Sequence, residues 1–487
     1  MTIHTARGTV GAAHILCRDL PQGAVLRMRV IGSRQPTPPA AWFRLRDVPV
    51  ERNTDTRFGL EKEGRVNPHV IRRAPFRIYD AMEPISAEVR VDAATLALRL
   101  HLPIPAGTSP GPRDYTVTLI AGSETATLRL RTVVAPARVP PVGPKSFPYT
   151  NWFDYQAIAQ RHGLDMWSPA YWTMLGRYAA LMAHGRQNTF WLPLPILFDS
   201  GRLNTTRLQR LVRLFSDAGL YWIEGGHVAG SFRDGDYRTS LGNLPATSVE
   251  GHAELARALI QMRQVLKAHH WEHRWFQHVA DEPRGEASPA YRILCGIVRK
   301  YMPGIPLMDA LMDPQLVGTT DIWVIQNDQV RDQLPHFQAQ REFGDRVWLY
   351  TCMGPGGNGL NRLLDMELIR PTLLSWACMA GGFDGFLHWG LNHYRDDQNP
   401  FQQSCHGDLP AGDTHILYPG PRAPWSSVRL EAHREGMEDL ELLRQLRRRN
   451  PAACDRLVRR VVRTCWDYTK DPAVLESARQ SLFRATP

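Results

Sequence analysis

The stretch Trp275-Phe276-Gln277-His278-Val279-Ala280-Asp281-Glu282-Pro283 decides how the fold is interpreted. Its apolar and aromatic residues predict a strand, and that strand ends at two carboxylates and a proline, which cannot donate to a neighbouring strand. If the strand belongs to a β/α barrel, its carboxyl end faces the active site, where paired carboxylates suit acid/base cleavage of a glycosidic bond.

Short apolar runs alternate with longer amphipathic segments on both sides of this stretch. Just before it, Val249–Leu266 places Leu255, Leu259 and Met262 on one helical face. Such alternation is typical of parallel strands joined by helical crossovers, and eight units in about 300 residues favour a (β/α)8 TIM-type barrel. The predicted strands lie near Tyr149–Phe153, Thr189–Leu194, Tyr221–Gly225, Arg274–Ala280, Ile305–Met308, Asp321–Ile325, Arg346–Tyr350 and Gly385–Trp389.

Residues 1–134 have a different pattern. Apolar and polar side chains alternate in runs such as Ala87–Val91, Thr116–Leu119 and Thr127–Arg131, which predicts an antiparallel β-sandwich. Residues 135–148 contain five prolines, too many for a helix or a central strand, and are interpreted as a stiff linker. The predicted domains are therefore the sandwich (1–134), the linker (135–148), the catalytic barrel (149–445) and a C-terminal helical extension (446–487).

The composition is that of an ordinary globular protein, with 487 residues, 43% hydrophobic content and a formal charge of +10. Part of this charge comes from arginines in the predicted C-terminal helices, which alternate with apolar residues at helical spacing. This favours a solvated helix face over a phosphate-binding surface, and no nucleic-acid partner is expected. The arginines are Arg447, Arg448, Arg449, Arg456, Arg459, Arg460 and Arg463.

The sequence lacks the patterns that are typical of several classes of protein. The seven cysteines show no CxxC spacing and are odd in number, so neither a disulfide framework nor a zinc site is indicated, and no cofactor or metal is expected. No apolar run approaches membrane-spanning length, and the N-terminus lacks the apolar core of a signal peptide. A soluble, cytoplasmic protein without a membrane partner is predicted, although a secreted or periplasmic protein without its leader would look the same. A homo-oligomer is compatible with the sequence.

The two acids Asp281 and Glu282 suit glycoside cleavage because like charges about 4 Å apart repel by roughly 4 kcal/mol at an effective dielectric of about 20, so one acid stays protonated. The alternative is that the pair only starts the next helix, where acids are favoured. Successive strand residues point to opposite faces, so both carboxylates reach one pocket only if the chain leaves the strand between them. Pro283 makes that departure plausible.

Polar and aromatic residues also cluster at the other predicted strand ends. For any single one, a satisfied loop side chain is the more common role. Glu224 and His227 follow the third predicted strand, and Asp309 and Asp313 follow the fifth. This mixture of histidine and aspartate invites a metal hypothesis, but no HExxH or comparable spacing supports it. The loop Gly354–Gly359 is interpreted as a flexible rim. The predicted substrate-binding residues are Asn151, Trp152, Gln326, Tyr350, Trp389 and Asn392.

With these residues in place, the chain resembles glycoside hydrolase family 123, the retaining β-N-acetylgalactosaminidases and their relatives. The order of sandwich, linker, barrel and C-terminal helix also matches, over roughly residues 85 to 445. The stretches that carry the resemblance are Asp281–Pro283, Trp348–Cys352, Gly381–Gly390, Tyr418–Pro421 and Ser427–Asp439.

The resemblance implies substrate-assisted catalysis, in which the 2-acetamido group of a terminal β-linked N-acetylhexosamine attacks the anomeric carbon and forms an oxazolinium intermediate. Asp281 would orient the acetamido nitrogen, and Glu282 would act as general acid and then general base. Tyr350 would donate a hydrogen bond to the acetamido carbonyl, and the indole of Trp389 would form the floor of the sugar-binding site. Two alternatives stay open: hydrolysis of a sugar without an acetamido group by a protein nucleophile, and a carbohydrate-binding barrel without catalysis.

Overall fold

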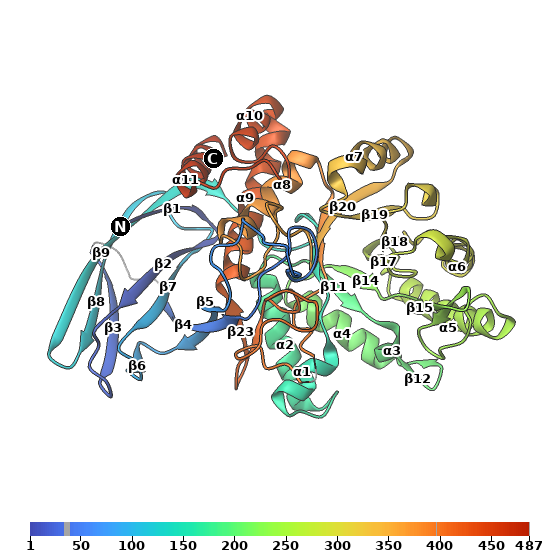
Figure 1. Ribbon diagram of the computed structural model, residues 1–487, viewed down its shortest axis with the longest axis horizontal. Helices are drawn as coiled ribbons and strands as arrows, with labels where there is room; N and C mark the ends of the chain where they lie inside the picture. The colour runs from blue at the N-terminus through green and yellow to red at the C-terminus, as the bar shows by residue number, and fades with distance from the viewer. Residues whose placement is uncertain (34–38, 396, 487) are drawn as a thin grey trace.

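The computed structural model describes residues 1–33, 39–395 and 397–486 and has a mixed α/β fold. Figure 1 shows the N-terminal strands, in blue and cyan, on one side of the molecule. The parallel strands and most helices lie on the other side, and the C-terminal helices lie over the junction. In the described ranges, no helix is both long and apolar enough to cross a membrane.

Two sheets form the N-terminal region, in the orders β1-β9-β8-β3-β6 and β2-β7-β4-β5-β23-β22. Leu98 and Leu100 of one sheet and Val117 and Leu119 of the other belong to one buried cluster. In β8 the buried residues alternate with more exposed ones, as the predicted period of two requires. The strands from this region are β1 Thr2–Arg7, β2 Thr9–Cys17, β3 Val25–Gly32, β4 Ala41–Val50, β5 Phe76–Ile85, β6 Glu88–Arg90, β7 Leu96–Ile104, β8 Gly111–Ala121 and β9 Glu124–Arg138.

Strand β9 extends four residues into the predicted linker, so the linker boundary is wrong at this end. Beyond Val134, β9 has no partner in β8 and pairs only with β1, where the register shifts before Arg7. Pro136 lies in this irregular stretch, and its carbonyl accepts a hydrogen bond from Arg7 Nε at 2.9 Å. A proline is tolerated there because a one-sided, irregular strand does not need its missing N–H.

The second region contains a five-stranded sheet, β10-β21-β20-β19-β18, and a three-stranded sheet, β11-β14-β17, in which every paired strand is parallel. All eight predicted strands are present. Strand β17 ends at Gln277, three residues before the predicted end at Ala280, and β18 begins three residues later than predicted because Pro306 cannot donate to a ladder. Their bounds are β10 Tyr149–Asn151, β11 Thr189–Leu192, β14 Trp222–Gly225, β17 Trp275–Gln277, β18 Met308–Ala310, β19 Ile322–Gln326, β20 Arg346–Thr351 and β21 Gly385–His388. Two small hairpins are β12 Phe198–Asp199 with β13 Arg202–Leu203, and β15 Ala229–Arg233 with β16 Asp236–Thr239.

Helices follow most of these strands, and capping side chains fix several of their starts. Asp154 accepts from the backbone N–H groups of Gln156 and Ala157, and Ser248 accepts from that of Gly251. The predicted helix Val249–Leu266 is confirmed and ends two residues later. The helices are α1 Tyr155–His162, α2 Pro169–His184, α3 Leu194–Leu197, α4 Thr205–Asp217, α5 Val249–Ala268, α6 Ser288–Tyr301, α7 Val330–Ala339, α8 Ile369–Gly381, α9 Val428–Arg449, α10 Pro451–Val461 and α11 Pro472–Ala485.

The segment 51–75, between β4 and β5, lies across the loop that follows β20. Figure 1 shows it as blue loops at the centre of the molecule. Thr54 donates from its backbone N–H and its hydroxyl to the two oxygens of Asp365, at 2.7 and 2.8 Å. The Gly356 N–H donates to the Arg57 carbonyl at 2.7 Å, and a Cβ on Gly354 would clash with the ring of Phe58. The predicted flexible rim Gly354–Gly359 is therefore wrong, since most of this loop is buried under the N-terminal region.

The C-terminal part of the chain crosses the predicted domain boundaries in two ways. Strands β22 (Tyr418–Pro419) and β23 (Pro424–Ser427) complete the N-terminal six-stranded sheet, with Ser426 opposite Met82 of β5. Helix α9 runs across the predicted boundary at residue 445 and is buried over most of its length. Arg429, in its first turn, pairs with Asp80 of β5 at 3.0 Å. Buried ion pairs and shared strands thus join the two regions.

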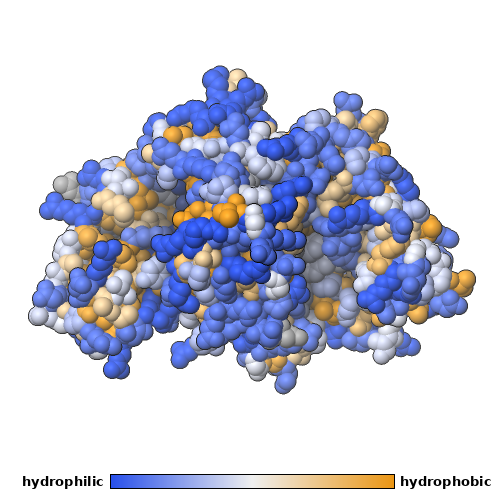
Figure 2. Space-filling model, viewed as in Figure 1, coloured by the Kyte–Doolittle hydropathy of each residue, from blue (hydrophilic) through white to orange (hydrophobic). Residues whose placement is uncertain are grey.

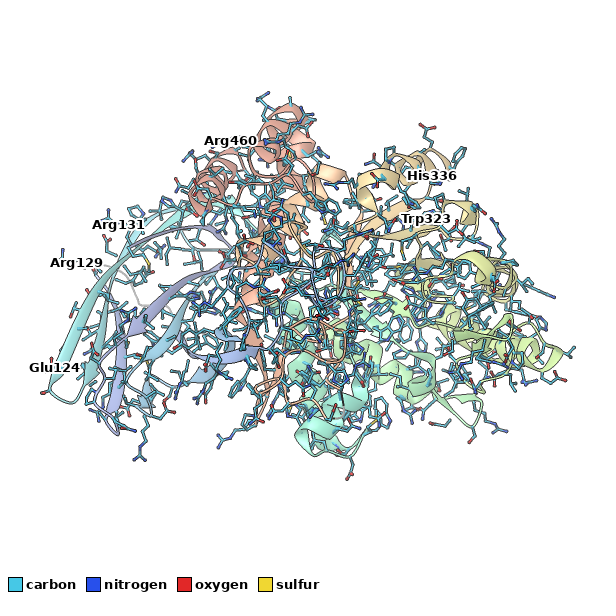
Figure 3. All side chains as sticks on the ribbon, in the orientation of Figure 1. Glu124, Arg129, Arg131, Trp323, His336 and Arg460 are labelled. Carbon is cyan, nitrogen blue, oxygen red and sulfur yellow. The ribbon has the colours of Figure 1, made fainter. Side chains whose placement is uncertain are left out.

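The surface carries its charge in scattered positions. Figure 2 shows a mainly hydrophilic face on which hydrophobic residues form small, separate groups. Figure 3 shows Arg129 and Arg131 at the outer edge of the N-terminal sheets, far from Arg460 on α10. The C-terminal arginines are exposed apart from the partly buried Arg447, as predicted for a solvated helix face. The seven cysteines are all free thiols.

Candidate functional site

The acid pair follows strand β17 and is turned out of it by an unusual backbone conformation. Glu282 has a φ of 45°, in the left-handed region that L residues rarely adopt. Because β17 already ends at Gln277, neither acid is a strand residue, and the strand alternation that would point them apart does not apply. Burial raises the pKa of Tyr350, and the charges of Glu282 and Asp281 add to this, while the hydroxyl itself donates a hydrogen bond to Glu282. Such strained non-glycine residues cluster at functional sites, which makes this turn a candidate position.

The surroundings keep both acids easy to protonate. Burial raises the pKa of Glu282, and the neighbouring charge of Asp281 adds to this, while hydrogen bonding from Tyr350 and the charge of Arg284 oppose it. Asp281 reaches solvent, yet enough protein surrounds it that desolvation raises its pKa, against the charges of His278 and Arg284. Glu282 accepts from Tyr350 Oη on one oxygen and from Arg284 Nη2, at 2.7 Å, on the other. A carboxylic acid held this way can give a proton and take it back.

Two more predicted residues lie on the same side of the acids. Tyr350 is buried, and its hydroxyl lies 3.5 Å from Met312 Sδ as well as against Glu282. Gln326 donates from Nε2 to Cys352 Sγ at 3.0 Å, and the charge of Glu282 is among the causes that raise the pKa of the Cys352 thiol, after burial. Tyr350, Gln326 and Cys352 therefore form one wall beside Glu282.

Two of the predicted substrate-binding residues are partly exposed tryptophans, Trp152 and Trp389. Trp152 lies parallel to Trp191 with ring centroids 4.7 Å apart, and its Nε1 donates to Glu224 at 2.7 Å. Trp389 donates from Nε1 to Asp413 at 3.2 Å, and burial raises the pKa of Asp413 to about 7. Both indoles are thus held by buried acids through their N–H groups, which fixes the ring planes.

The other two predicted substrate-binding residues are fully occupied inside the protein. Asn392 accepts from the backbone N–H of Asp154 at 2.9 Å and donates to its carbonyl at 3.0 Å. Asn151 accepts from Arg362 Nη1 at 2.6 Å and donates to Gln187 at 3.1 Å. Both are almost completely buried. In this structure they hold backbone and side chains in place and do not face the acid pair.

Directly below the acids, three buried side chains from adjacent strands form a chain of hydrogen bonds. His278 Nε2 lies 2.8 Å from Glu224 Oε1, and its Nδ1 lies 2.9 Å from Asp309 Oδ1. All three side chains are inaccessible to solvent. The two carboxylates raise the pKa of His278 to about 9 against the effect of burial.

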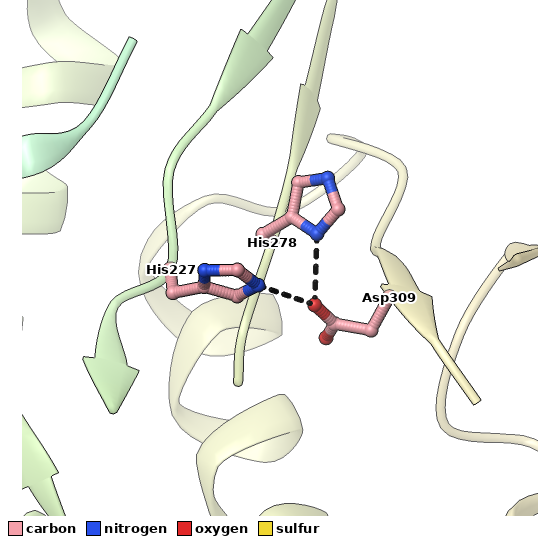
Figure 4. Close-up of side chains that lie close together, drawn as sticks. All are labelled: His227, His278 and Asp309. Carbon is pink, nitrogen blue, oxygen red and sulfur yellow. Dashed lines mark hydrogen bonds and ion pairs between the residues drawn. The ribbon is translucent and has the colours of Figure 1, made fainter. Parts of the chain in front are cut away.

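His227, His278 and Asp309 are a group of side chains that could hold a metal ion, since one donor atom of each lies within 4.8 Å of the others. Figure 4 shows both histidines directed at the same oxygen of Asp309. His227 Nε2 lies 3.7 Å from that oxygen and has no hydrogen-bond partner. His278 is already held at both ring nitrogens, and a metal would have to displace the proton shared with Asp309. The observed hydrogen bonds are those of a protonated histidine between two carboxylates.

Carboxylates also gather at a second place, a cavity of about 220 Å³ between β1, α9 and α11. Its lining includes Glu435, Asp439 and Arg479, and Arg479 pairs with Asp439 at 3.0 Å and with Glu435 at 3.5 Å. Asp439 and Glu435 are paired with the partly buried Arg479 and lie at the junction of the two regions. They are structural ion pairs, so the acid pair after β17 is the better catalytic candidate.

Some of the site was not predicted from the sequence. The sequence pattern places His278 inside a strand and indicates no role for it, and it gives no indication of Arg57, from the segment 51–75. Arg57 lies 3.8 Å from Asp328, whose pKa burial raises and which is also affected by the charge of Glu282. A histidine inside an apolar strand was a usable signal for His278. No sequence signal places residue 57 beside a strand end more than 260 residues away.

Comparison with known proteins gives a family model that matches part of the chain and a structure with a similar fold. Residues 229–446 match the family model described as the catalytic domain of glycoside hydrolase 123. No curated protein matches the chain. A family 123 glycoside hydrolase from Clostridium perfringens, studied for the details of glycolipid glycan hydrolysis, has a similar structure, with a TM-score of 0.72 and 12% sequence identity. The match covers 100% of this chain and 93% of that one.

Other glycosidase structures are more distant. A GH10 xylanase with a bacterial Ig-like domain from termite gut has a TM-score of 0.37 and 12% identity, over 73% of this chain and 91% of that one. A β-D-glucuronidase from Dictyoglomus thermophilum has a TM-score of 0.34 and 9% identity, over 84% of this chain and 68% of that one. No property of this chain is inferred from them.

Proposed function

We propose that this chain, a glycosidase with a catalytic domain of glycoside hydrolase family 123, is a retaining exo-β-N-acetylgalactosaminidase that acts by substrate-assisted catalysis. The observation that carries the proposal is the turn at Glu282, where two neighbouring carboxylates of raised pKa follow β17 and Glu282 accepts a hydrogen bond from the hydroxyl of Tyr350. The substrate class is a carbohydrate with a terminal β-linked N-acetylhexosamine.

We infer that the two parallel sheets together make one eight-stranded β/α barrel, and that the two N-terminal sheets make a β-sandwich. A parallel bridge between Gln277 and Leu307 joins the two parallel sheets on one side. On the other side, Asn188, just before β11, accepts from the Tyr149 N–H at 3.0 Å and donates to the Tyr149 carbonyl at 3.3 Å. In such a barrel the acids lie at the carboxyl-terminal face, where barrel enzymes carry their active sites.

The reaction follows from the positions of the two acids. Protonated Glu282 gives its proton to the glycosidic oxygen as the bond from that oxygen to the anomeric carbon breaks. The acetamido oxygen of the substrate forms a new bond to the same carbon, and ionised Asp281 accepts a hydrogen bond from the acetamido N–H. Water then attacks the anomeric carbon while Glu282 takes its proton, and the oxazolinium ring opens with overall retention. No protein nucleophile is required.

The remaining residues would bind the sugar. Trp152 and Trp389 offer partly exposed indole faces, and an indole face matches the C–H face of a pyranose. The Tyr350 hydroxyl, which donates to Glu282 in the free enzyme, would donate to the acetamido carbonyl once substrate is bound. Such a switch would release Glu282 for proton transfer at the moment the substrate is in place.

A specific observation supports a second candidate, a glycosidase that uses a protein nucleophile. Asp328 is partly exposed, has one buried oxygen without a hydrogen-bond partner, and interacts electrostatically with Glu282. In that mechanism Glu282 would be the acid and Asp328 the nucleophile, and the sugar would need no acetamido group. A 2-fluoro glycoside would then trap a covalent adduct on Asp328.

The test compares hydrolysis of 4-nitrophenyl β-N-acetylgalactosaminide and its gluco epimer by wild type, Glu282→Gln and Glu286→Gln. Glu286 is an exposed glutamate four residues further along the chain and serves as the matched control. We expect faster turnover of the galacto substrate, a loss of about 10²- to 10⁴-fold in Glu282→Gln and wild-type rates in Glu286→Gln. A thiazoline mimic of the oxazolinium ion should inhibit strongly. Full activity of Glu282→Gln, or insensitivity to the thiazoline, would contradict the proposal.

A further inference from the structure

We propose that the buried chain Glu224–His278–Asp309 is a positioning device for the acid pair, in which Asp309 holds the backbone leading into Asp281 and His278 ties Asp309 to the sugar-facing Trp152. The inference rests on the proposed function in so far as the acid pair is catalytic. None of the three side chains needs to contact the substrate, so each is a positioning residue.

Asp309 is the member that touches the backbone of the turn. Its Oδ2 accepts from the N–H groups of Val279 at 3.0 Å and Ala280 at 3.3 Å, the two residues directly before Asp281. The same oxygen accepts from the hydroxyl of Tyr291 at 2.7 Å. One carboxylate of strand β18 therefore fixes the path of the chain as it leaves strand β17. Because Glu282 is left-handed, an error in this path would move both acids.

A protonated His278 offsets one of the two negative charges that Glu224 and Asp309 bring into the interior. Its two ring nitrogens face oxygens of Glu224 and Asp309, and an ionised carboxylate can only accept hydrogen bonds. A neutral imidazole has a single N–H and would leave a lone pair pointing at one of the carboxylates. A protonated His278 donates to both and turns two buried negative charges into a chain of net charge −1.

Glu224 extends the chain to the sugar side of the site. Its Oε1 accepts from Trp152 Nε1 at 2.7 Å as well as from His278, and its Oε2 accepts from the Thr150 hydroxyl at 2.7 Å. The ring of Trp152 lies edge-on to the ring of His278, with centroids 5.5 Å apart. The indole ring of Trp152 and the backbone that leads to the two acids are thus both held in place through the same buried imidazolium of His278.

The charged groups around His278 predict how the pH profile of hydrolysis depends on the charge of this histidine. Glu224 and Asp309 face it from neighbouring strands, and both raise the pKa of His278. His227 lies 4.9 Å away between ring centroids, with its own pKa lowered to about 3 by burial first and by the His278 charge. Asp281 lies above it, and the charge of His278 lowers the pKa of Asp281. Removing that charge should therefore make Asp281 ionise at a higher pH.

The first experiment measures kcat and KM on 4-nitrophenyl β-N-acetylgalactosaminide for Asp309→Asn. An amide in place of this carboxylate brings an NH2 group against either Tyr291 and the two backbone donors or His278. We expect kcat to fall about 100-fold with KM changed less than threefold. Tyr291→Phe, which removes one donor, should lower kcat about fivefold. Tyr171→Phe is the matched control, because its buried hydroxyl donates to the Tyr155 carbonyl at 3.0 Å, and it should stay within twofold of wild type.

The second experiment separates positioning from simple structural support by using His278→Gln. In the pH profile of kcat/KM, the acidic limb of this variant should lie at a higher pH than that of wild type. Loss of packing alone would not cause this shift. Nitrogen-15 spectra of histidine-labelled wild type, assigned by comparison with this variant, should show His278 protonated at pH 7. This readout does not depend on hydrolysis of any substrate, so inactivity of the wild type on both aryl glycosides would contradict only the proposed function.

Three results would overturn the positioning device. One is an Asp309→Asn variant that folds normally and keeps kcat within threefold of wild type. Another is a neutral His278 at pH 7, or an acidic limb that does not move in His278→Gln. The third is one equivalent of zinc in the purified protein that is lost in His227→Ala, because the metal would then occupy the place of the shared proton.

Discussion

The polar residues at the strand ends form two groups that the sequence makes look alike. Asp281 and Glu282 follow β17, reach solvent and have raised pKa values. Asn151 and Asn392 lie at the end of β10 and beyond the end of β21, but both are buried and use their amides to hold Arg362 and the Asp154 backbone. The difference is in the backbone: a left-handed residue turns the acids outward, whereas the asparagines stay in an interior of matched donors and acceptors. On the proposed function, the polar residues that serve chemistry are those that follow the point where the chain has left the strand.

The largest expected effect is on the exposed pair. We expect Asp281→Asn to lower kcat by about 10²- to 10³-fold, because an amide cannot accept from the acetamido N–H as a carboxylate does. The thermal midpoint should stay within about 2 °C of wild type, since the side chain is exposed. Kinetics and a melting curve on the same preparation check both statements. If Asp281→Asn kept more than a tenth of the wild-type kcat, Asp281 would be a structural residue like Asn151 and Asn392.

Tyr350 touches the acid pair from the buried side, and its removal should have an intermediate effect. Tyr350→Phe deletes the hydrogen bond that stabilises the Glu282 carboxylate, so the pKa of Glu282 rises further. Glu282 then stays protonated to a higher pH, and the alkaline limb of kcat/KM should move upward while its maximum falls about tenfold. A pH–rate profile of both proteins measures this shift. A limb that stays in place would assign the alkaline ionisation to another group.

Substitution of the buried asparagines should lower the stability of the protein and hardly change its catalysis. Asn392→Ala removes both hydrogen bonds to the Asp154 backbone and should cost about 2 kcal/mol of stability, with kcat/KM within about threefold of wild type. Denaturation curves compared with the exposed control Asn399→Ala test this expectation. If KM rose tenfold while the stability was unchanged, Asn392 would be a sugar ligand and the contrast between the two groups would fail.

The smallest effect is expected from metal removal. The proposed chemistry uses only carboxylic acids and the substrate's acetamido group, and His278 is held by two carboxylates through its protons. Prolonged dialysis against EDTA should therefore leave kcat/KM unchanged, as should later addition of zinc at equimolar concentration. A loss of activity that zinc restores would move His227, His278 and Asp309 from the structural group to the catalytic one.

Local patterns allowed much of the fold to be predicted. All eight parallel strands and the helix α5 were found from apolar runs and helical spacing, because these patterns reflect which faces are buried. Boundaries were less reliable: β9 continues into the proline-rich segment, and β22 and β23 join the N-terminal sheet. Both errors have one cause, since a strand is extended or recruited by a partner that is distant in sequence. The buried loop Gly354–Gly359 is another example, because the segment covering it comes from residues 51–75.

The sequence by itself determined the strand that leads to Asp281-Glu282, the alternation around it and the resemblance to a glycosidase family, since local spacing encodes period and turn. The tertiary structure decided which polar residues face the acids and which are used up inside. Only the fold places Glu224, His278 and Asp309 in one line, brings Tyr350 to Glu282 and sets Arg57 beside Asp328. Hydrogen bonds and charges act over a few ångströms, and distance in space between residues far apart in the chain is fixed by packing, which no local pattern records.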